Sequence, residues 1–520
     1  MRRSSRVLVA FIALTISALH GQQSGTSYTV QGTVINSLSG EPIPRALVVI
    51  QDSEIRMTLT DANGHFEFDT VHVDTAYIRA GKKGYILPGE LSPASSLEQV
   101  ASEANSQSGP IVITLSPASA IVGKIVSPDG EPLEEVPVRL FYYGPIDGEE
   151  RLKPHADVLT DEEGEFSFND LPAGQFFLVA GPQADKPLVP VERPGIPSRS
   201  YGQFFYPGVS DPHNATPINL NAGQELAVTL PLLQERPFKI VGQVVGWHAG
   251  DAGELELKPV FGPNTEISGN FDGATARFVI NQVPSGWHRL QLSSKGSYVL
   301  QRELFVDSDL RELRLSLDQV RRIPLIVRAN NLRARGGHVS LTLIPQDKWQ
   351  EPVSLGPLRS DSEESSLLLP PPGKYRVHFD LFPPLYVITA RCGSLDLLRE
   401  PLVVTGQTND PIEVTLAYDR ATFGGQVRSQ GRPVQGHLLI LPVEPAGEPR
   451  IERTDLAGNF AGLQLHPGTY RVWAFDHLPL YYKEAGRLDR FASSAQIVKL
   501  APDQKLEVTV DLLEVGQSDE

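Results

Sequence analysis

The stretch Thr60-Asp61-Ala62-Asn63-Gly64-His65-Phe66 holds the pattern from which the fold can be predicted. The carboxylate of Asp61 can accept hydrogen bonds from nearby backbone amides, and Gly64 can adopt a positive φ. The chain can therefore turn back here, and the antiparallel strand that follows carries Phe66 and Phe68 on one face. The stretch predicts a β-hairpin that brings aromatic side chains into a core.

The same pattern occurs twice more along the chain. It reads Thr160-Asp161-Glu162-Glu163-Gly164-Glu165-Phe166 and then Thr454-Asp455-Leu456-Ala457-Gly458-Asn459-Phe460. Each of the three copies follows a turn with Gly and Pro: Gly40-Glu41-Pro42, Gly130-Glu131-Pro132 and Gly431-Arg432-Pro433. Three copies this similar indicate a small module that is repeated along one chain.

Alternating strands predict how many modules there are. Tyr28–Val34 is the first opening strand, and Ala46–Ile50 is an apolar run between turn residues. Further opening strands are expected at Ile121–Ile125, Ile240–Val244, Ile323–Val327 and Phe423–Val427. Closing strands are expected at Ile111–Leu115, Leu226–Leu230, Leu313–Leu317, Ile412–Leu416 and Leu506–Val510. Five closing strands predict five modules.

The predicted class is all-β, a tandem array of about five antiparallel β-sandwiches, since the 45 Gly and 43 Pro suit turns between short strands. The third and fourth modules depart from the pattern, with only Asp272-Gly273 before Phe278 and Ser360-Asp361 before Leu367. The expected boundaries are a signal at 1–21 and modules at 28–117, 118–233, 238–319, 320–418 and 420–514.

The N-terminal residues resemble a secretory signal. Arg2, Arg3 and Arg6 precede an apolar run from Val7 to Leu19, which is short for a membrane span. We expect residues 1–21 to be removed and the mature protein to be secreted or periplasmic; the alternative is an uncleaved anchor. No later stretch has the apolar length of a transmembrane helix, so no membrane span is expected after signal removal.

Charge and cysteine content narrow the possible partners and stabilising elements. The formal net charge is −16, and loss of the three arginines with the signal would make it −19, so a nucleic acid partner would be repelled. Cys392 is the only cysteine, so no intrachain disulfide can form and each module depends on its own hydrophobic core.

Taken together, these motifs resemble the carboxypeptidase regulatory-like domain, as it occurs in strings in secreted bacterial proteins. The resemblance is carried by Val122-Gly123-Lys124-Ile125, Gly130-Glu131-Pro132, Thr160-Asp161 with Gly164 and Phe166, and Pro172 with Gly174 and Phe176. It implies a transthyretin-like, or prealbumin-like, β-sandwich and a non-catalytic role, related to carbohydrate-binding-like folds, and it names no ligand.

Sequence signatures of catalysis are missing. None of the twelve His residues begins a His-x-x-Glu or His-Glu-x-x-His zinc motif, and there is no Gly-x-Ser-x-Gly elbow. We therefore predict no enzyme activity, no catalytic residues, no cofactor and no bound metal. A weak calcium site at the acidic turns around Asp61 and Asp161 is the alternative to a solvated hairpin turn, which the spacing favours.

The aromatic segment Tyr201-Gly202-Gln203-Phe204-Phe205-Tyr206 is the candidate ligand-binding surface. Tyr201, Phe204, Phe205 and Tyr206 could stack on sugars or anchor a peptide. The alternative, which a comparable Leu480-Tyr481-Tyr482 in the fifth module favours, is that these rings cover their own sandwich.

The sequence thus predicts a non-enzymatic binding or scaffold protein with a protein or glycan partner at the cell envelope. Two alternatives stay open: a carbohydrate-binding protein that uses the aromatic loops, and an accessory part of an extracellular hydrolase system.

Overall fold

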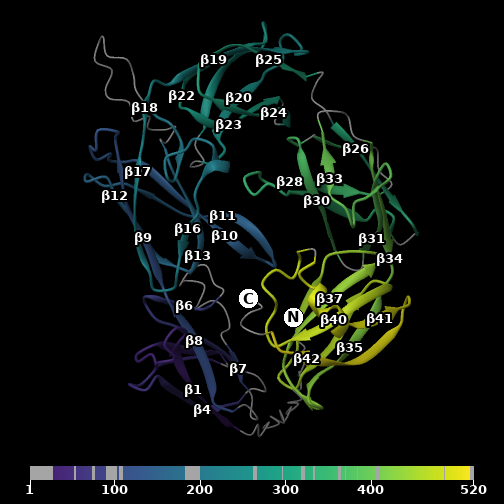
Figure 1. Cartoon of the computed structure of the whole chain (residues 1–520). Coiled ribbons are helices and arrows are strands. Elements are labelled where there is room, and N and C mark those ends of the chain that lie inside the picture. The colour runs from purple at the N-terminus through teal and green to yellow at the C-terminus, as the bar shows by residue number, and fades with distance from the viewer. Residues whose placement is uncertain are drawn as a thin grey trace, which may run out of the picture.

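The computed structural model describes the chain from residue 27 to residue 515, apart from 52–53, 73–75, 89–101, 105–108, 182–199, 262–265, 295–296, 318–321, 332–333, 361–364, 369, 383–384, 406–409 and 485. The proposed signal at 1–21 lies outside the described residues. The regular secondary structure of the described chain is almost entirely β-strand, arranged in five successive units (Figure 1). Its helices are short 3-10 turns, and no described helix is long and apolar enough to cross a bilayer.

The first unit packs the sheet β4-β1-β8-β6 with the sheet β3-β2-β5-β7. Its strands are β1 (Tyr28–Asn36), β2 (Leu47–Gln51), β3 (Ile55–Leu59), β4 (His65–Val71), β5 (Ala76–Gly81), β6 (Tyr85–Ile86), β7 (Ser102–Ala104) and β8 (Ile111–Pro117).

The second unit contains the sheets β11-β10-β13-β15, with β16 also on β13, and β12-β9-β17; β14 and β18 form a small ribbon. Its elements are β9 (Ser119–Val126), β10 (Pro137–Ile146), β11 (Glu149–Leu159), β12 (Glu165–Leu171), β13 (Gly174–Ala180), β14 (Ser200–Tyr201), β15 (Phe204–Phe205), a 3-10 turn (Pro212–Asn214), β16 (Ile218–Leu220), β17 (Glu225–Pro231) and β18 (Gln234–Glu235).

The third unit is one seven-stranded sheet, β24-β23-β20-β21-β22-β19-β25. Its strands are β19 (Phe238–Val245), β20 (Glu254–Pro259), β21 (Ile267–Asp272), β22 (Arg277–Val283), β23 (Gly286–Ser294), β24 (Ser297–Val306) and β25 (Leu310–Ser316).

The fourth unit packs the sheet β29-β26-β34-β31-β32 with the sheet β28-β27-β30-β33. Its strands are β26 (Arg322–Ala329), β27 (His338–Pro345), β28 (Val353–Arg359), β29 (Ser365–Leu368), β30 (Gly373–Leu381), β31 (Leu385–Cys392), β32 (Leu395–Asp396), β33 (Leu402–Val404) and β34 (Ile412–Tyr418).

The fifth unit follows the order β36-β35-β42-β40-β37-β38, with β39 on β35 and β41 on β40. Its elements are β35 (Ala421–Ser429), β36 (Arg432–Pro433), β37 (His437–Glu444), β38 (Arg450–Arg453), β39 (Asn459–Leu465), β40 (Gly468–Phe475), a 3-10 turn (Asp489–Ser494), β41 (Gln496–Leu500) and β42 (Lys505–Leu513).

One topology is shared by all five units. The opening strand of each unit pairs in parallel with its closing strand, in the pairs β1·β8, β9·β17, β19·β25, β26·β34 and β35·β42. The other neighbour of the opening strand is antiparallel, namely β4, β12, β22, β29 or β39. The predicted all-β array of five modules is confirmed, and the parallel pair is a feature that the strand pattern alone did not specify.

The repeated hairpin is held by its own Thr and Asp. The buried Thr60 hydroxyl donates to the carbonyl of Ile43 at 2.6 Å and accepts from the amide of Ala46 at 2.8 Å. Oδ1 of Asp61 accepts from the amides of His65 and Asn63, and these backbone hydrogen bonds lower the pKa of Asp61. Asp161 repeats the arrangement, which supports the interpretation as a hairpin turn.

The core is divided among the units. Each of five large clusters of buried apolar residues lies within one unit, as expected for modules that are stabilised separately. Two smaller clusters lie outside these cores, one around Trp349 and one around Trp473. The first of these joins different units and determines how they are arranged.

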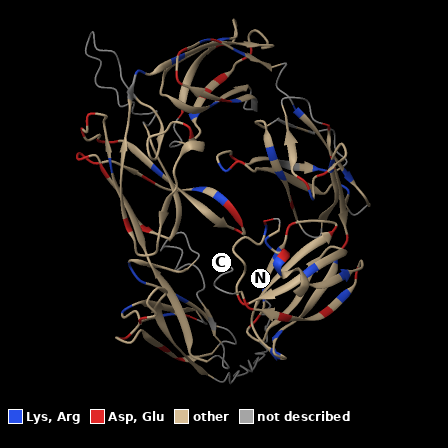
Figure 2. Cartoon of the chain, in the orientation of Figure 1, with Lys and Arg blue, Asp and Glu red and all other residues tan. Residues whose placement is uncertain are grey.

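The units follow a curved path rather than a straight rod. In Figure 1 the fifth unit lies across from the second, and the long β10–β11 hairpin points toward it. Basic and acidic residues are interspersed over the units, and both kinds are present on this hairpin (Figure 2). Because the path is curved, units that are distant in sequence come into contact, and a binding site can form between them.

Candidate binding cleft between the fourth and fifth units

Trp349 of the fourth unit packs on aromatic rings of the second and third units. It is 4 % exposed, and its ring centroid lies 5.0 Å from that of Phe177, 5.3 Å from Phe205 and 5.4 Å from Phe261. All three contacts are edge-on, a favourable geometry for aromatic pairs. This cluster fixes the fourth unit against the second and third.

The predicted aromatic segment is largely enclosed. β15 pairs with β13, so its two side chains point to opposite faces. Phe204 enters the core of its own unit at 5 % exposure, whereas Phe205 is fully buried in the Trp349 cluster. Tyr201 and Tyr206 are partly buried against the core. The two phenyl rings are therefore covered by protein and do not form an open stacking surface.

The tip of the β10–β11 hairpin contacts the fifth unit. Asp147 accepts hydrogen bonds from Tyr482 at 3.1 Å and from Nζ of Lys483 at 2.8 Å, while the carbonyl of Gly148 accepts from the amide of Lys483 at 3.0 Å. The amide of Glu150 donates to Glu484 at 3.0 Å. The second unit thus touches the fifth directly, although more than three hundred residues separate the partners in sequence.

Arg376 on β30 connects three units. Its guanidinium forms ion pairs with Glu149 of the second unit and with Glu448 of the fifth. Glu149 also binds Arg151, at 2.5 Å. Since Arg376 itself belongs to the fourth unit, one side chain joins units two, four and five, and it also lines a cleft between units four and five.

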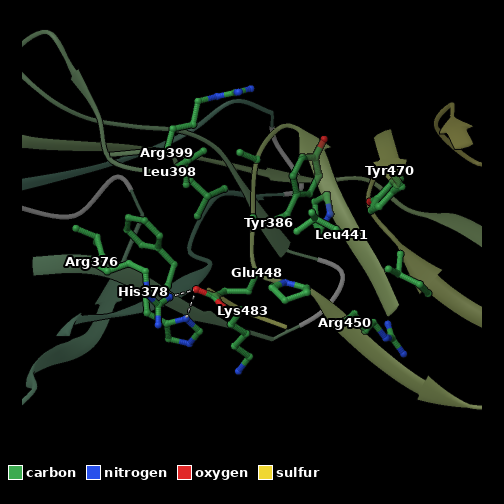
Figure 3. A pocket seen from close by; sticks show the side chains of 18 of the residues that line it. Arg376, His378, Tyr386, Leu398, Arg399, Leu441, Glu448, Arg450, Tyr470 and Lys483 are labelled. Carbon is green, nitrogen blue, oxygen red and sulfur yellow. Dashed lines mark hydrogen bonds and ion pairs between the residues drawn. The ribbon is translucent and has the colours of Figure 1, made fainter. Parts of the chain in front are cut away.

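The cleft lies between the fourth and fifth units and has a volume of about 620 Å³. β30, β31 and the residues after β32 supply one wall, and β37, β38, β40 and the loop around Lys483 supply the other (Figure 3). Leu398 and Leu441 are among its apolar side chains, and Arg399, Arg450 and Lys483 are among its charged ones. The volume falls in the range of small-molecule sites in proteins.

Three charged side chains, those of His378, Glu448 and Asp380, interact at one end of the cleft. Nδ1 of His378 lies 3.5 Å from Glu448, and Nε2 lies 2.9 Å from Asp380. Contact with Glu448 raises the pKa of His378 against the opposing effect of burial. Burial alone would raise the pKa of Glu448, but His378 and Arg376 outweigh it and leave that pKa lowered. Histidine and glutamate therefore favour their charged forms and neutralise each other.

An aromatic pair joins the two walls elsewhere in the cleft. The rings of Tyr386 and His466 are stacked, with centroids 4.6 Å apart and an interplanar angle of 13°. Burial raises the pKa of Tyr386 and lowers that of His466, so both groups favour their neutral forms. A neutral, flat surface of this kind suits contact with an apolar or aromatic group.

This arrangement is suited to binding. A general base must be unprotonated to accept a proton, whereas the contacts of His378 favour its cation. Among the described residues, no group of three or more His, Cys, Asp and Glu has the arrangement needed to hold a metal ion. The cleft therefore offers a ligand apolar area together with charged side chains.

The fold, in which the opening strand of each unit pairs in parallel with its closing strand, defines a multi-module protein of prealbumin-like β-sandwiches. Within it, residues 29–88 match the model of the carboxypeptidase regulatory-like domain, so the resemblance is confirmed in the first unit. A comparison with curated protein sequences finds no match.

Similar solved structures include three bacterial pilins. A streptococcal ancillary pilin is 14 % identical, covering 56 % of this chain and 99 % of its own, with a TM-score of 0.19. BcpA, the major pilin subunit of Bacillus cereus, is 10 % identical over 56 % and 99 %, with a TM-score of 0.15. The shaft pilin SpaA from Lactobacillus rhamnosus GG is 8 % identical over 40 % and 97 %, with a TM-score of 0.20. TM-scores this low support no conclusion about the activity of this chain.

The cleft residues were not among the sequence candidates. Arg376, His378 and Glu448 lie in no repeated motif, and they meet only because the fourth and fifth units pack side by side. Trp349 likewise follows β27 without any distinctive neighbours in sequence. The one available signal was composition, because Trp occurs only four times in the chain.

Proposed function

We propose that this chain is a non-catalytic, extracytoplasmic binding protein whose modules form a scaffold around a ligand cleft. The observation that carries the proposal is the cleft of about 620 Å³ between the fourth and fifth units. The N-terminal signal pattern and the carboxypeptidase regulatory-like domain support its place outside the cytoplasm and its non-catalytic role.

The contacts between units support the scaffold part of the proposal. Trp349 packs against two other units, and additional ion pairs surround it: Arg289 with Glu351 at 2.6 Å and His213 with Asp347 at 3.1 Å. Aromatic packing supplies most of the stabilisation here, since exposed ion pairs contribute little each. Units fixed in this way would hold the two walls of the cleft at a constant separation.

The lining of the cleft indicates the class of ligand. Apolar side chains from both walls, together with the Tyr386–His466 stack, suit an apolar body. Five Lys and Arg and four Asp and Glu side chains line the cleft. Four of the basic residues form ion pairs: Arg376 with Glu448, Arg399 with Asp396, Arg450 with Glu452 and Lys483 with Asp147. Arg471 lies in the lining as well and forms no ion pair with the described residues. We infer a small amphipathic ligand with an anionic end.

Titration with 1-anilinonaphthalene-8-sulfonate, a dye with an aromatic body and an anionic group, tests this function. The unmodified protein should show saturable fluorescence enhancement. The variant Leu398→Arg, which places charge and bulk in the cleft, should bind at least about tenfold more weakly, a loss of about 1.4 kcal/mol. Val112→Arg is the control, because Val112 is 62 % exposed on β8 of the first unit and lies outside the cleft lining.

Equal dye binding by both variants would place the site elsewhere. A hydrolase activity that Glu448→Gln abolishes would contradict the non-catalytic role. Cell fractionation of the native chain, with the mature N-terminus read by mass spectrometry, tests the extracytoplasmic location; an unprocessed cytoplasmic chain would overturn it.

A further inference from the structure

The outer surface of β3 in the first unit is unusually apolar for an edge strand. Ile55, Met57 and Leu59 alternate along it with exposed fractions of 63 %, 65 % and 53 %. Among the described strands β3 pairs with β2 alone, in five consecutive register pairs without a bulge. Its outward-directed backbone groups therefore lie along an edge of the sheet, beside the face that carries its apolar side chains.

The apolar surface continues onto the neighbouring strands. Met57 lies opposite Val49 and Leu59 opposite Leu47 on β2, and both β2 residues belong to the outward-facing set because Val48 and Ile50 are fully buried. Tyr77 on β5, 42 % exposed, lies opposite Gln51 in the same outward row. Contiguous apolar surface of this kind marks an interaction site in a soluble protein.

The other four units modify the equivalent strand. β11 carries Pro154, several charged residues and a register shift against β10. β28 contains Pro357 and a register shift, and β38 reads Arg-Ile-Glu-Arg. β21 is paired on both sides, so it is not an edge. Charge, proline and bulges are the usual protection against edge-to-edge pairing, and β3 has none of them on its outward face.

The pattern of β3 is symmetric about Met57. An antiparallel copy of the strand centred there would place Met57 opposite Met57, Ile55 opposite Leu59 and Arg56 opposite Thr58, with no like charges facing each other. The guanidinium of Arg56 is already turned to its own unit, where it donates to the carbonyl of Asp69 at 2.6 Å. The edge is therefore complementary to itself, as a two-fold interface requires.

We propose that β3 pairs with β3 of a second copy of this chain, which joins two four-stranded sheets into one continuous sheet. The contact spans five residues, so it buries less than the roughly 1,600 Å² of a standard stable interface and gives a weak, concentration-dependent dimer. Its strength would increase wherever two chains are held close to each other.

Cysteine cross-linking of the full chain in a Cys392→Ser background tests the register. Met57→Cys should form a disulfide-linked dimer under mild oxidation, because directly opposed residues in an antiparallel pair have Cα atoms about 4.5–5.5 Å apart. Ile55→Cys alone should not, since two such residues would lie about 13 Å apart along the ladder. A mixture of Ile55→Cys and Leu59→Cys chains should cross-link again.

Sedimentation velocity supplies the second measurement. The unmodified chain should shift toward dimer between about 10 and 500 μM, the range expected for a weak interface. Met57→Lys should stay monomeric, and Leu38→Lys, a change at a 66 % exposed turn residue of the same unit, should behave as the unmodified chain. A monomer throughout, equal cross-linking by Ile55→Cys alone, or dimers that persist in Met57→Lys would overturn the proposal.

Discussion

Gly242 lies directly opposite Phe278 in the ladder between β19 and β22, and the phenyl ring fills the space that a side chain at 242 would occupy. A Cβ there would lie 2.4 Å from Cζ of Phe278 and 2.3 Å from the carbonyl oxygen of Leu313. The same opposed pair recurs as Gly32 with Phe66, Gly123 with Phe166 and Gly425 with Phe460. The third unit therefore keeps this packing although its hairpin motif is degenerate.

Gly32→Ala should destabilise the first unit. Its Cβ would lie 2.3 Å from the carbonyl oxygen of Ile111 and 2.6 Å from the Phe66 ring, so either β8 or the ring must move. We expect a loss of about 1–3 kcal/mol, typical of overpacking, seen as an earlier transition in denaturant unfolding. Gly109→Ala in the same unit, where a Cβ would meet nothing within 4 Å, should leave that transition in place.

Trp349→Ala should loosen the arrangement of the units. The substitution removes a ring that contacts Phe177, Phe205 and Phe261 across two boundaries, and truncation of a buried Trp costs about 3–5 kcal/mol. Small-angle X-ray scattering should show a larger radius of gyration. Trp247→Ala is the control, because Trp247 packs on Phe271 within the third unit; the same expansion in that variant would rule out a specific role for Trp349.

Gly148→Ala should detach the hairpin tip from the fifth unit. Residue 148 has φ of +80°, and a Cβ would lie 2.5 Å from the Tyr482 ring. The backbone amide of Lys483 donates to the carbonyl of Gly148, so hydrogen exchange at the Lys483 amide should become faster in the variant. Gly130→Ala carries a similar positive φ of +85° in the same unit with nothing within 4 Å, so it separates backbone strain from loss of contact.

The stability of the junction between the fourth and fifth units should decrease both when the pH rises and when it falls. His378 has a raised pKa, so its contribution to stability is complete below the ordinary value of 6.5 and is lost as pH rises through the raised pKa. Glu448 has a lowered pKa, so its contribution is complete above the ordinary value of 4.5 and is lost as pH falls through the lowered pKa.

Stability from this pair should therefore be greatest between about pH 4.5 and 6.5. Thermal unfolding of the native chain and of His378→Gln, followed from about pH 5 to about pH 9 so that it passes through the raised pKa of His378, gives the measurement. The difference in melting temperature between the two proteins should shrink toward alkaline pH; a difference independent of pH would show that the pair does not act through charge.

Local patterns were sufficient to predict the modules. The closing strands and the Thr-Asp hairpins depend on alternation and turn chemistry within a few residues, and each formed where the spacing placed it: Ile111–Leu115 lies in β8 and Leu506–Val510 in β42. Alternation also explains the aromatic segment, since adjacent residues of β15 face two different cores.

The cleft could not be predicted in this way. Arg376 meets Glu149 across a separation of 227 residues, and Tyr386 stacks on His466 from another unit. Such contacts depend on how complete units are oriented, which short-range periodicity does not encode. The outward-facing apolar residues of β3 had a visible signal, Ile-Arg-Met-Thr-Leu, but the alternation does not say which face is covered.

The parallel pairing of opening and closing strands has a mechanical consequence. Because β1 and β8 run in the same direction as neighbours, the chain enters the first unit at one end of this pair and leaves it at the other. A pull along the chain would load the hydrogen bonds between the two strands in shear, all at once, instead of opening them one after another. The same geometry in every unit would let the array resist tension without a covalent cross-link.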